Sequence, residues 1–123
     1  MKYLILIHSN RQSREIWDSM SEAQRADGLQ AYANLHEELA ASGELLAAEA
    51  LADPSQAKRI SVRDGRAIVT DGPFAEVKEQ LGGFFFIQCE DLERAIAIAA
   101  RVPEATLGLV EVRPIMTSSG LEM

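Results

Sequence analysis

The sequence predicts an α+β domain in which one sheet carries its two helices on the same face. Short apolar runs alternate with longer amphipathic segments in the order strand, helix, strand, hairpin, strand, helix, strand. Each helix links two strands, which is the arrangement of the ferredoxin-like fold. No repeat, low-complexity segment or linker interrupts this order. We therefore expect one domain over residues 1–116 and a flexible tail over residues 117–123.

The first half of the chain provides a strand, a long helix and a second strand. Residues 2–8 are apolar on both alternating faces, which indicates a central strand covered on both sides. The segment 9–20 is polar and broken, so we expect no element there. Two capping-box patterns, in 19–22 and 21–24, predict a helix that ends at Gly43. The apolar stripe expected to face inward from this helix is Leu29, Tyr32, Leu35, His36 and Leu39.

The second half begins with a strand over residues 44–51 and a hairpin. The hairpin strands are 58–62 and 67–70, and they flank Asp64-Gly65, a pair that favours a tight turn. Residues 84–89 are expected to form a further strand.

The last two elements are a helix and a strand. Asp91 is the expected N-cap of a helix over residues 92–101, and Pro103 follows its end. The residues expected to face inward are Leu92, Ala95, Ile96 and Ala99. Residues 109–113 form the last expected strand. Two helices cover only one face of the sheet, so its other face would be exposed and apolar. We therefore expect a homodimer packed through that face.

Composition excludes several classes of partner. The net charge is −7, which argues against binding to nucleic acid or to an anionic membrane surface. The apolar runs are too short to span a bilayer, which requires ~20 residues. The single cysteine, Cys89, cannot form an internal disulfide, and we expect it to pack as a small apolar residue in a cytoplasmic protein.

The most unusual stretch runs from Val69 to Phe84. It reads Val-Thr-Asp-Gly-Pro-Phe-Ala-Glu, then, after one valine, Lys-Glu-Gln-Leu-Gly-Gly-Phe. This stretch resembles the DGPF signature of the YCII-related family, small bacterial α+β proteins. The similarity extends to the first strand, at 1–4, and to the last, at 110–114. The resemblance implies a dimeric α/β barrel-like assembly with a cleft at its centre.

Asp71 in this stretch has two interpretations. A carboxylate held by a tight turn near a cleft could act as a general base or as a polar anchor. Alternatively, it only accepts backbone N–H groups and sets the turn. Lys78 and Glu79 follow in the same loop, and Lys78 would shift the ionisation of a carboxylate paired with it.

Tyr32 and His36 lie one helical turn apart and therefore share a face. A histidine there could transfer a proton near neutral pH, or could be a partly buried core residue. Some members of the resembled family carry a histidine on the first helix, proposed as a catalytic pair with an aspartate. Alignment of the helix ends places that histidine at Tyr32, which can donate a proton or a hydrogen bond but is a weak base at pH 7.

The remaining candidates are His8, at the end of the first strand, and Arg113, on one face of the last strand with Glu111. Either the Glu111–Arg113 pair lines the cleft or it is a structural ion pair. Two histidines and one cysteine without ligand spacing make a poor metal set, so we expect no metal and no cofactor.

Two functions are compatible with these residues. The first is a cofactor-free acid–base enzyme, or a binder of a small polar metabolite, with Asp71 and Tyr32 as catalytic candidates. Ligand-binding candidates are Lys78, Glu79, Arg113, His8 and His36. The second is a non-enzymatic interaction or regulatory module, because the resemblance implies an association with genes for alternative sigma factors.

Overall fold

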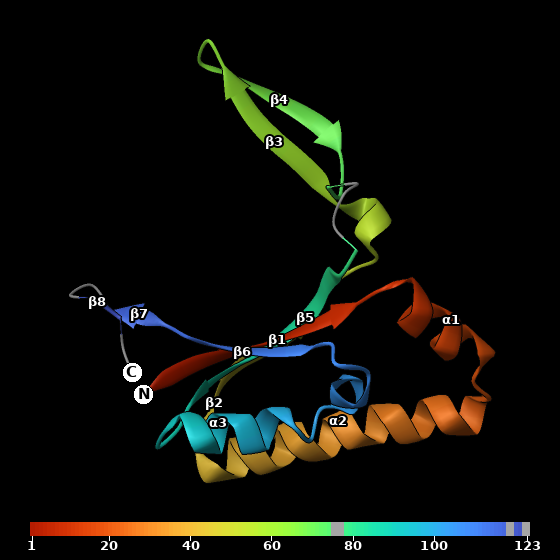
Figure 1. Cartoon of the computed structure of the whole chain (residues 1–123), viewed down its shortest axis with the longest axis vertical. Coiled ribbons are helices and arrows are strands. Elements are labelled where there is room, and N and C mark those ends of the chain that lie inside the picture. Colours follow the sequence, from red (N-terminus) through yellow and green to blue (C-terminus); the bar gives the residue numbers. More distant parts are fainter. Residues whose placement is uncertain (75–77, 118–119, 122–123) are drawn as a thin grey trace.

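A computed structural model describes residues 1–74, 78–117 and 120–121. Four strands form one antiparallel sheet in the order β2-β5-β1-β6 (Figure 1). Helices α2 and α3 lie together on one face of this sheet. The predicted α+β class is confirmed, and the predicted elements follow one another along the chain in the expected order, with one additional helix. The bounds are β1 Lys2–Ser9, β2 Leu45–Ala50, β5 Gln80–Gln88, β6 Val110–Pro114, α2 Glu22–Ser42 and α3 Leu92–Ala99.

The core lies between the sheet and these two helices. Alternate residues of the central strands point toward the helices, and Ile5 and Ile87 are fully buried there. Leu35 and Leu39 of α2 and Ile98 of α3 close the same core. The opposite face of the sheet, which we call the open face, is partly exposed. Leu4, Leu6, Phe84, Phe86, Glu111 and Arg113 are among its side chains.

The long helix begins and ends as its sequence predicts. The Ser21 side chain accepts the Gln24 N–H and the Gln24 side chain accepts the Ser21 N–H, which completes a capping box. Gly43 ends the helix in a left-handed conformation, with φ of 80°. Leu29 and His36 are exposed rather than inward, because the buried stripe is narrower than the apolar pattern.

Residues 9–20 contain a helix that the sequence prediction missed. Helix α1, Arg11–Ser19, is capped by Asn10 and Ser13, which exchange side-chain and backbone hydrogen bonds. Its only large apolar side chains are Ile16 and Trp17, so its composition concealed a helix formed by local capping. Helix α3 also differs from the expectation: Leu92 and Ile96 are exposed. Ile98 instead takes the buried position beside the correctly predicted Ala95 and Ala99.

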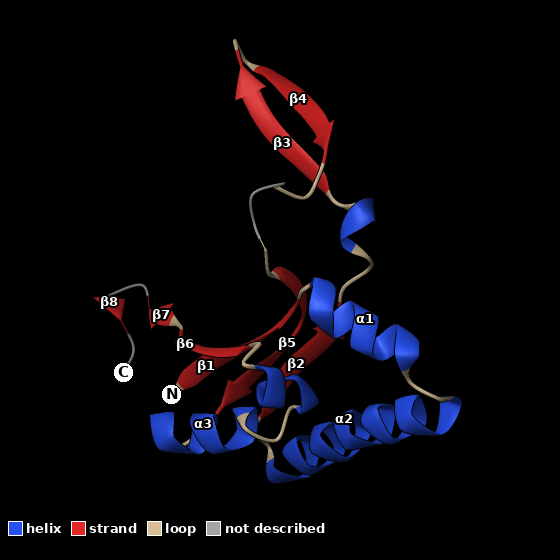
Figure 2. Ribbon diagram, turned by 45° about the vertical axis from the view of Figure 1, so that its right-hand side comes forward, coloured by secondary structure: helices blue, strands red, loops and turns tan. Residues whose placement is uncertain are grey.

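The predicted hairpin is confirmed, but it is separate from the main sheet. Strands β3, Lys58–Arg63, and β4, Arg66–Asp71, pair only with each other and extend away from the body (Figures 1 and 2). We call this hairpin, residues 58–71, the arm. Its turn uses positive φ at Asp64, 52°, and Gly65, 73°, as the sequence implied.

Four short elements complete the described chain. The 3-10 turns are η1, Pro54–Gln56, at the base of the arm, and η2, Pro103–Leu107, after α3. Near the C-terminus, β7, Met116–Thr117, pairs with β8, Gly120–Leu121. Part of the expected tail, at 118–119 and 122–123, lies outside the described residues, and the boundary at 116 stays a prediction.

Candidate functional site

A cavity of about 740 Å³ opens between α2, the end of β1 and strands β2 and β5. Helix α1 and turn η2 contribute to its wall. The lining residues are Ile7, His8, Ser9, Trp17, Leu29, Tyr32, Ala33, His36, Ala48, Glu49, Ala50, Gly82, Gly83, Phe84, Phe85 and Glu104. A second cavity of about 500 Å³ shares Trp17, Leu29, Tyr32 and Glu104 with it, so the two adjoin.

The polar centre of the cavity is the pair formed by Tyr32 and Glu104. The Tyr32 hydroxyl of α2 donates a hydrogen bond to the Glu104 carboxylate of η2. Burial raises the pKa of Tyr32 well above its usual range, and the hydrogen bond and charge of Glu104 raise it further. Tyr32 is therefore a neutral donor at every physiological pH. Within the described part of the chain, Glu104 makes no other side-chain hydrogen bond, so it has acceptor capacity to spare.

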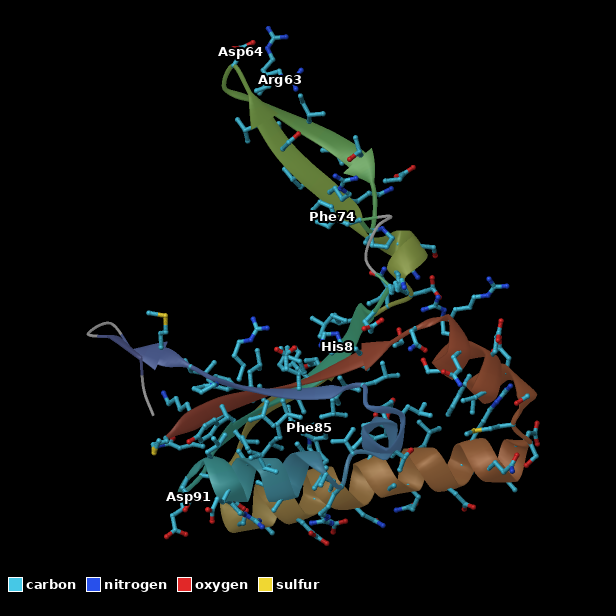
Figure 3. The ribbon with its side chains drawn as sticks, viewed as in Figure 1. His8, Arg63, Asp64, Phe74, Phe85 and Asp91 are labelled. Atoms are coloured by element: carbon cyan, nitrogen blue, oxygen red, sulfur yellow. The ribbon has the colours of Figure 1, made fainter. Side chains whose placement is uncertain are left out.

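An aromatic pair and a glycine shape the inner wall. The rings of Tyr32 and Phe85 stack with centroids 6.4 Å apart and planes 10° from parallel. Phe85 projects from β5 toward the helices (Figure 3). Beside it, Gly83 lies against edge strand β2, where an added Cβ would come 2.9 Å from the Glu49 carbonyl oxygen. The glycine thus permits the close strand approach that forms this side of the cavity.

Trp17 of α1 forms the outer wall. The Arg25 guanidinium lies 5.4 Å from the centroid of the indole ring and donates hydrogen bonds to the carbonyls of Trp17, at 3.0 Å, and Asp18, at 3.1 Å. These contacts tie α1 to the first turns of α2. The helix that the sequence prediction missed therefore provides part of the site.

The charge of the lining is acidic. None of the described lining residues is lysine or arginine. Strand alternation places the His8 and Glu49 side chains on the open face, so these two side chains point away from a ligand in the cavity. The ionisable side chains left to the cavity are Tyr32, His36 and Glu104.

His8 belongs to a second polar cluster, on the open face. Its Nε2 lies 3.3 Å from Glu111 Oε1, and Arg113 donates to the other Glu111 oxygen at 2.6 Å. Arg113, and then His8, hold the pKa of Glu111 below its usual range. The His8 Nδ1 atom is buried and has no hydrogen-bond partner among the described residues. Glu111 and Arg113 thus form an ion pair, one of the two arrangements that the sequence left open.

Asp71 lies at the base of the arm and not in the cavity. Its exposed carboxylate pairs with Lys58 on the opposite strand. The following Gly72 donates its N–H to the Ala57 carbonyl at 2.9 Å. Arg59 lies 4.1 Å from the ring centroid of Phe74, which Figure 3 shows at the base of the arm. The described part of the Asp-Gly-Pro-Phe stretch is therefore a corner that closes the base of the arm.

The structure separates the predicted site residues into four places. Tyr32 and His36 line the cavity, whereas His8 and Arg113 meet on the open face. Asp71 lies on the arm, and Lys78 and Glu79 are exposed just before β5. The predicted grouping of Asp71 with Tyr32 is not found in this chain.

The family of the chain follows from comparison with known proteins. A family model described as the YCII-related domain matches residues 1–119. The chain belongs to the YCII-related family. It is also similar to an uncharacterised protein of Rhizobium meliloti (strain 1021), with 32% identity over 117 residues, which cover 94% of this chain and 92% of that protein.

Other features of this YCII-related protein bear on its function. In the described ranges, no three His, Cys, Asp or Glu side chains gather as a metal site. The helices in those ranges are too short or too polar to cross a membrane. Cys89 is buried in the core as expected, and burial raises the pKa of its thiol.

Glu104 is the site residue that sequence reasoning missed in this YCII-related chain. It is one of 19 acidic residues, and it meets Tyr32 across 72 positions of sequence. Its position one residue after Pro103, in the first turn of η2, is the only local pattern that singles it out.

Proposed function

We propose that the cavity binds a small organic molecule with an apolar body and a cationic or hydrogen-bond-donating head group. The observation that supports this proposal is the Tyr32–Glu104 pair at the wall of a cavity of about 740 Å³. A volume in this range suits a small-molecule ligand. The sequence suggested a small polar metabolite as the ligand. The cavity restricts that class to molecules with a cationic or hydrogen-bond-donating head group.

The lining favours this class of ligand over an anion. Trp17, Leu29 and Phe85 offer apolar and aromatic surface to the body of the molecule. Glu104 offers a carboxylate that is already oriented by Tyr32. Because no described lining residue of the 740 Å³ cavity is lysine or arginine, an anionic head group there would meet the Glu104 carboxylate without a cation in that lining. Arg14 lines only the adjoining cavity.

The roles of the cavity side chains differ from the sequence-based hypothesis. Tyr32 stays protonated, so it orients Glu104 and donates a hydrogen bond rather than removing a proton. Proton transfer, in an acid–base reaction on the bound molecule, falls to Glu104 and His36. Asp71 takes no part in hydrogen bonding or proton transfer in the cavity. We assign it a structural role, in the corner that the DGPF signature of the subgroup forms at the base of the arm.

The same proposal includes a homodimer formed through the open face. Leu4, Leu6, Phe84 and Phe86 are only partly buried there, on the side of the sheet opposite α2 and α3. A second copy would remove this apolar surface from water, at about 25 cal/mol per Å². It would place two open faces together, in agreement with the barrel-like assembly that the family resemblance implies.

The binding proposal is tested with matched amines and carboxylates. Thermal shift is measured with phenethylamine and tryptamine against phenylacetate and indole-3-acetate, on the wild type and on Glu104→Gln and Tyr32→Phe. At 100 times its dissociation constant, a ligand adds about 2.7 kcal/mol to the free energy of unfolding. We expect stabilisation by an amine, reduced by Glu104→Gln. Glu37→Gln, on an exposed part of α2 outside the cavity, is the matched control.

Two outcomes would contradict the proposal. Stronger stabilisation by the carboxylates would reverse the assigned ligand class. An amine effect that is the same in the wild type and Glu104→Gln would place the ligand elsewhere. The absence of any shift would favour the alternative hypothesis of a non-enzymatic interaction module linked to sigma factors.

A further inference from the structure

The arm has little packing of its own. All six residues of β3 and all six of β4 are exposed to solvent. An isolated two-stranded hairpin is marginally stable in water at best. An arm of this length is therefore expected to have a partner that covers one of its faces.

One face of the arm is an apolar stripe. Ile60 pairs with Val69, and Val62 pairs with Ala67, so these side chains project from the same side of the hairpin. Ile60, Val62 and Val69 are 61%, 70% and 58% exposed. Contiguous β-branched side chains on a surface with this exposure are typical of a protein interface.

The direction of the arm indicates what covers this stripe. The arm rises on the side of the sheet opposite α2 and α3, which is the side of the open face (Figures 1 and 2). A body that covers the open face therefore lies alongside the arm. The contacts at its base, between Gly72 and Ala57 and between Arg59 and Phe74, hold together the two chain segments that enter and leave the arm.

The charge of the arm also matches another copy of this protein. Residues 58–71 carry four basic and two acidic side chains. The rest of the chain carries eight basic and 17 acidic side chains. The arm is therefore positive and the remainder strongly negative, so an arm is attracted to the body of a second copy.

We propose that the arm clasps a second copy of this chain and buries the stripe of Ile60, Val62 and Val69 against it. This inference rests on the proposed homodimer through the open face and adds a separate contact to it. In a two-fold dimer each copy gives its arm to the other, so the contact occurs twice. The Asp-Gly-Pro-Phe corner then serves assembly, because it sets the direction of the arm.

Sedimentation equilibrium of the wild type and three variants measures separately how much the arm and the open face each contribute to dimer formation. The wild type is expected at twice the chain mass of 13.5 kDa. Ile60→Asp on the arm and Phe86→Ser on the open face are each expected to raise the dimer dissociation constant by about tenfold or more. Ile96→Asp is the matched control, because Ile96 is 52% exposed on α3 and away from both surfaces. Its dissociation constant should stay within about twofold of the wild type.

The outcomes separate the two contacts. If Phe86→Ser dissociates and Ile60→Asp dimerises like the control, the dimer through the open face stands and the clasp is overturned. A monomeric wild type overturns both proposals.

A label on the arm gives a second readout that does not depend on the effect of Ile60→Asp on folding. Cys89 is buried, so a benzophenone maleimide attached to Val62→Cys reports on the arm alone. Irradiation should give a covalent dimer whose crosslink maps to the second copy. A crosslink only within one chain contradicts the proposal.

Discussion

Tyr32 and Glu104 lie 72 positions apart in the chain, yet the tyrosine hydroxyl donates a hydrogen bond to the glutamate carboxylate. The bond joins α2 to η2 at the wall of the cavity. It positions a carboxylate at the cavity wall and keeps the tyrosine neutral. Stability and ligand binding are thus linked through one contact.

Removal of this hydrogen bond should destabilise the protein. Tyr32→Phe is expected to lower the free energy of unfolding by about 1.5 kcal/mol, because a bond to a charged acceptor is lost. Urea titration followed by Trp17 fluorescence measures the change. The double variant with Glu104→Gln should show a coupling energy of about 1 kcal/mol between the two sites. Strictly additive effects would show that the bond does not form in solution.

The raised pKa of Tyr32 predicts a loss of stability in alkali. Tyrosine in the unfolded chain ionises at its usual pKa of 10.0, whereas burial and Glu104 keep folded Tyr32 neutral. The stabilisation of the neutral form is complete below pH 10.0 and is lost as the pH rises above it, by up to about 1.4 kcal/mol per pH unit. Unfolding measured at increasing alkaline pH should show this slope, and Tyr32→Phe should make it shallower by the contribution of Tyr32. Tyrosinate absorbance from Tyr32 near pH 10 in the folded protein would refute the prediction.

Two glycine-to-alanine substitutions should change the free energy of unfolding in opposite directions. At Gly83 the new Cβ would lie 2.9 Å from the Glu49 backbone oxygen, so Gly83→Ala is expected to cost about 1–3 kcal/mol. At Gly28, inside α2, the nearest atom belongs to Trp17 at 4.0 Å. Gly28→Ala should therefore add about 0.5–1 kcal/mol through helix propensity. Thermal unfolding of both variants decides the matter, and equal effects would contradict the close approach of β5 to β2.

The Glu44–Arg94 pair should contribute stability that disappears in acid. Arg94 donates to both Glu44 oxygens, at 2.9 and 2.8 Å, and holds the pKa of this carboxyl below its usual value of 4.5. The contribution is present above pH 4.5 and is lost as the pH falls through the lower, folded pKa. At neutral pH, Arg94→Ala is expected to cost about 0.5–1 kcal/mol, since Arg94 is half-exposed.

Urea unfolding at pH 7 and at about pH 3 tests this pair, and the wild type and Arg94→Ala should converge at the lower pH. The control is Arg11→Ala, whose pair with Glu15 is more exposed, at 89% and 66% of the two side chains. It should change stability by less than about 0.5 kcal/mol at either pH. A difference for Arg94→Ala that persists in acid would assign its effect to packing instead.

Sequence periodicity predicted the sheet and its helices because their signals are local. The cap at Ser21, the left-handed Gly43 and the Asp64-Gly65 turn are each specified by a few adjacent residues. Helix α1 was missed because hydrogen bonds between Asn10 and Ser13 start it without an extended apolar stripe. The exposure of Leu92 and Ile96 was missed because α3 contacts the sheet over a stripe narrower than its apolar pattern.

Sequence analysis could predict only part of the candidate site. Tyr32 and His36 share a helix face, and spacing alone places them together. Glu104 joins them only because η2 folds back over the end of the sheet, a contact without a local pattern. Asp71 attracted attention through its unusual neighbours, but those residues form the corner of the arm.

The central position of β1 has a consequence for biosynthesis. Both neighbours of this apolar strand come from the second half of the chain, since β5 begins at Gln80 and β6 at Val110. At about 5–20 residues per second, a ribosome needs roughly 4–14 s to proceed from the end of β1 to the start of β5. During that interval a strand that ends up paired along both edges has neither of its partner strands. The nascent chain is therefore most exposed to aggregation, and most dependent on chaperones, before β5 has left the ribosome.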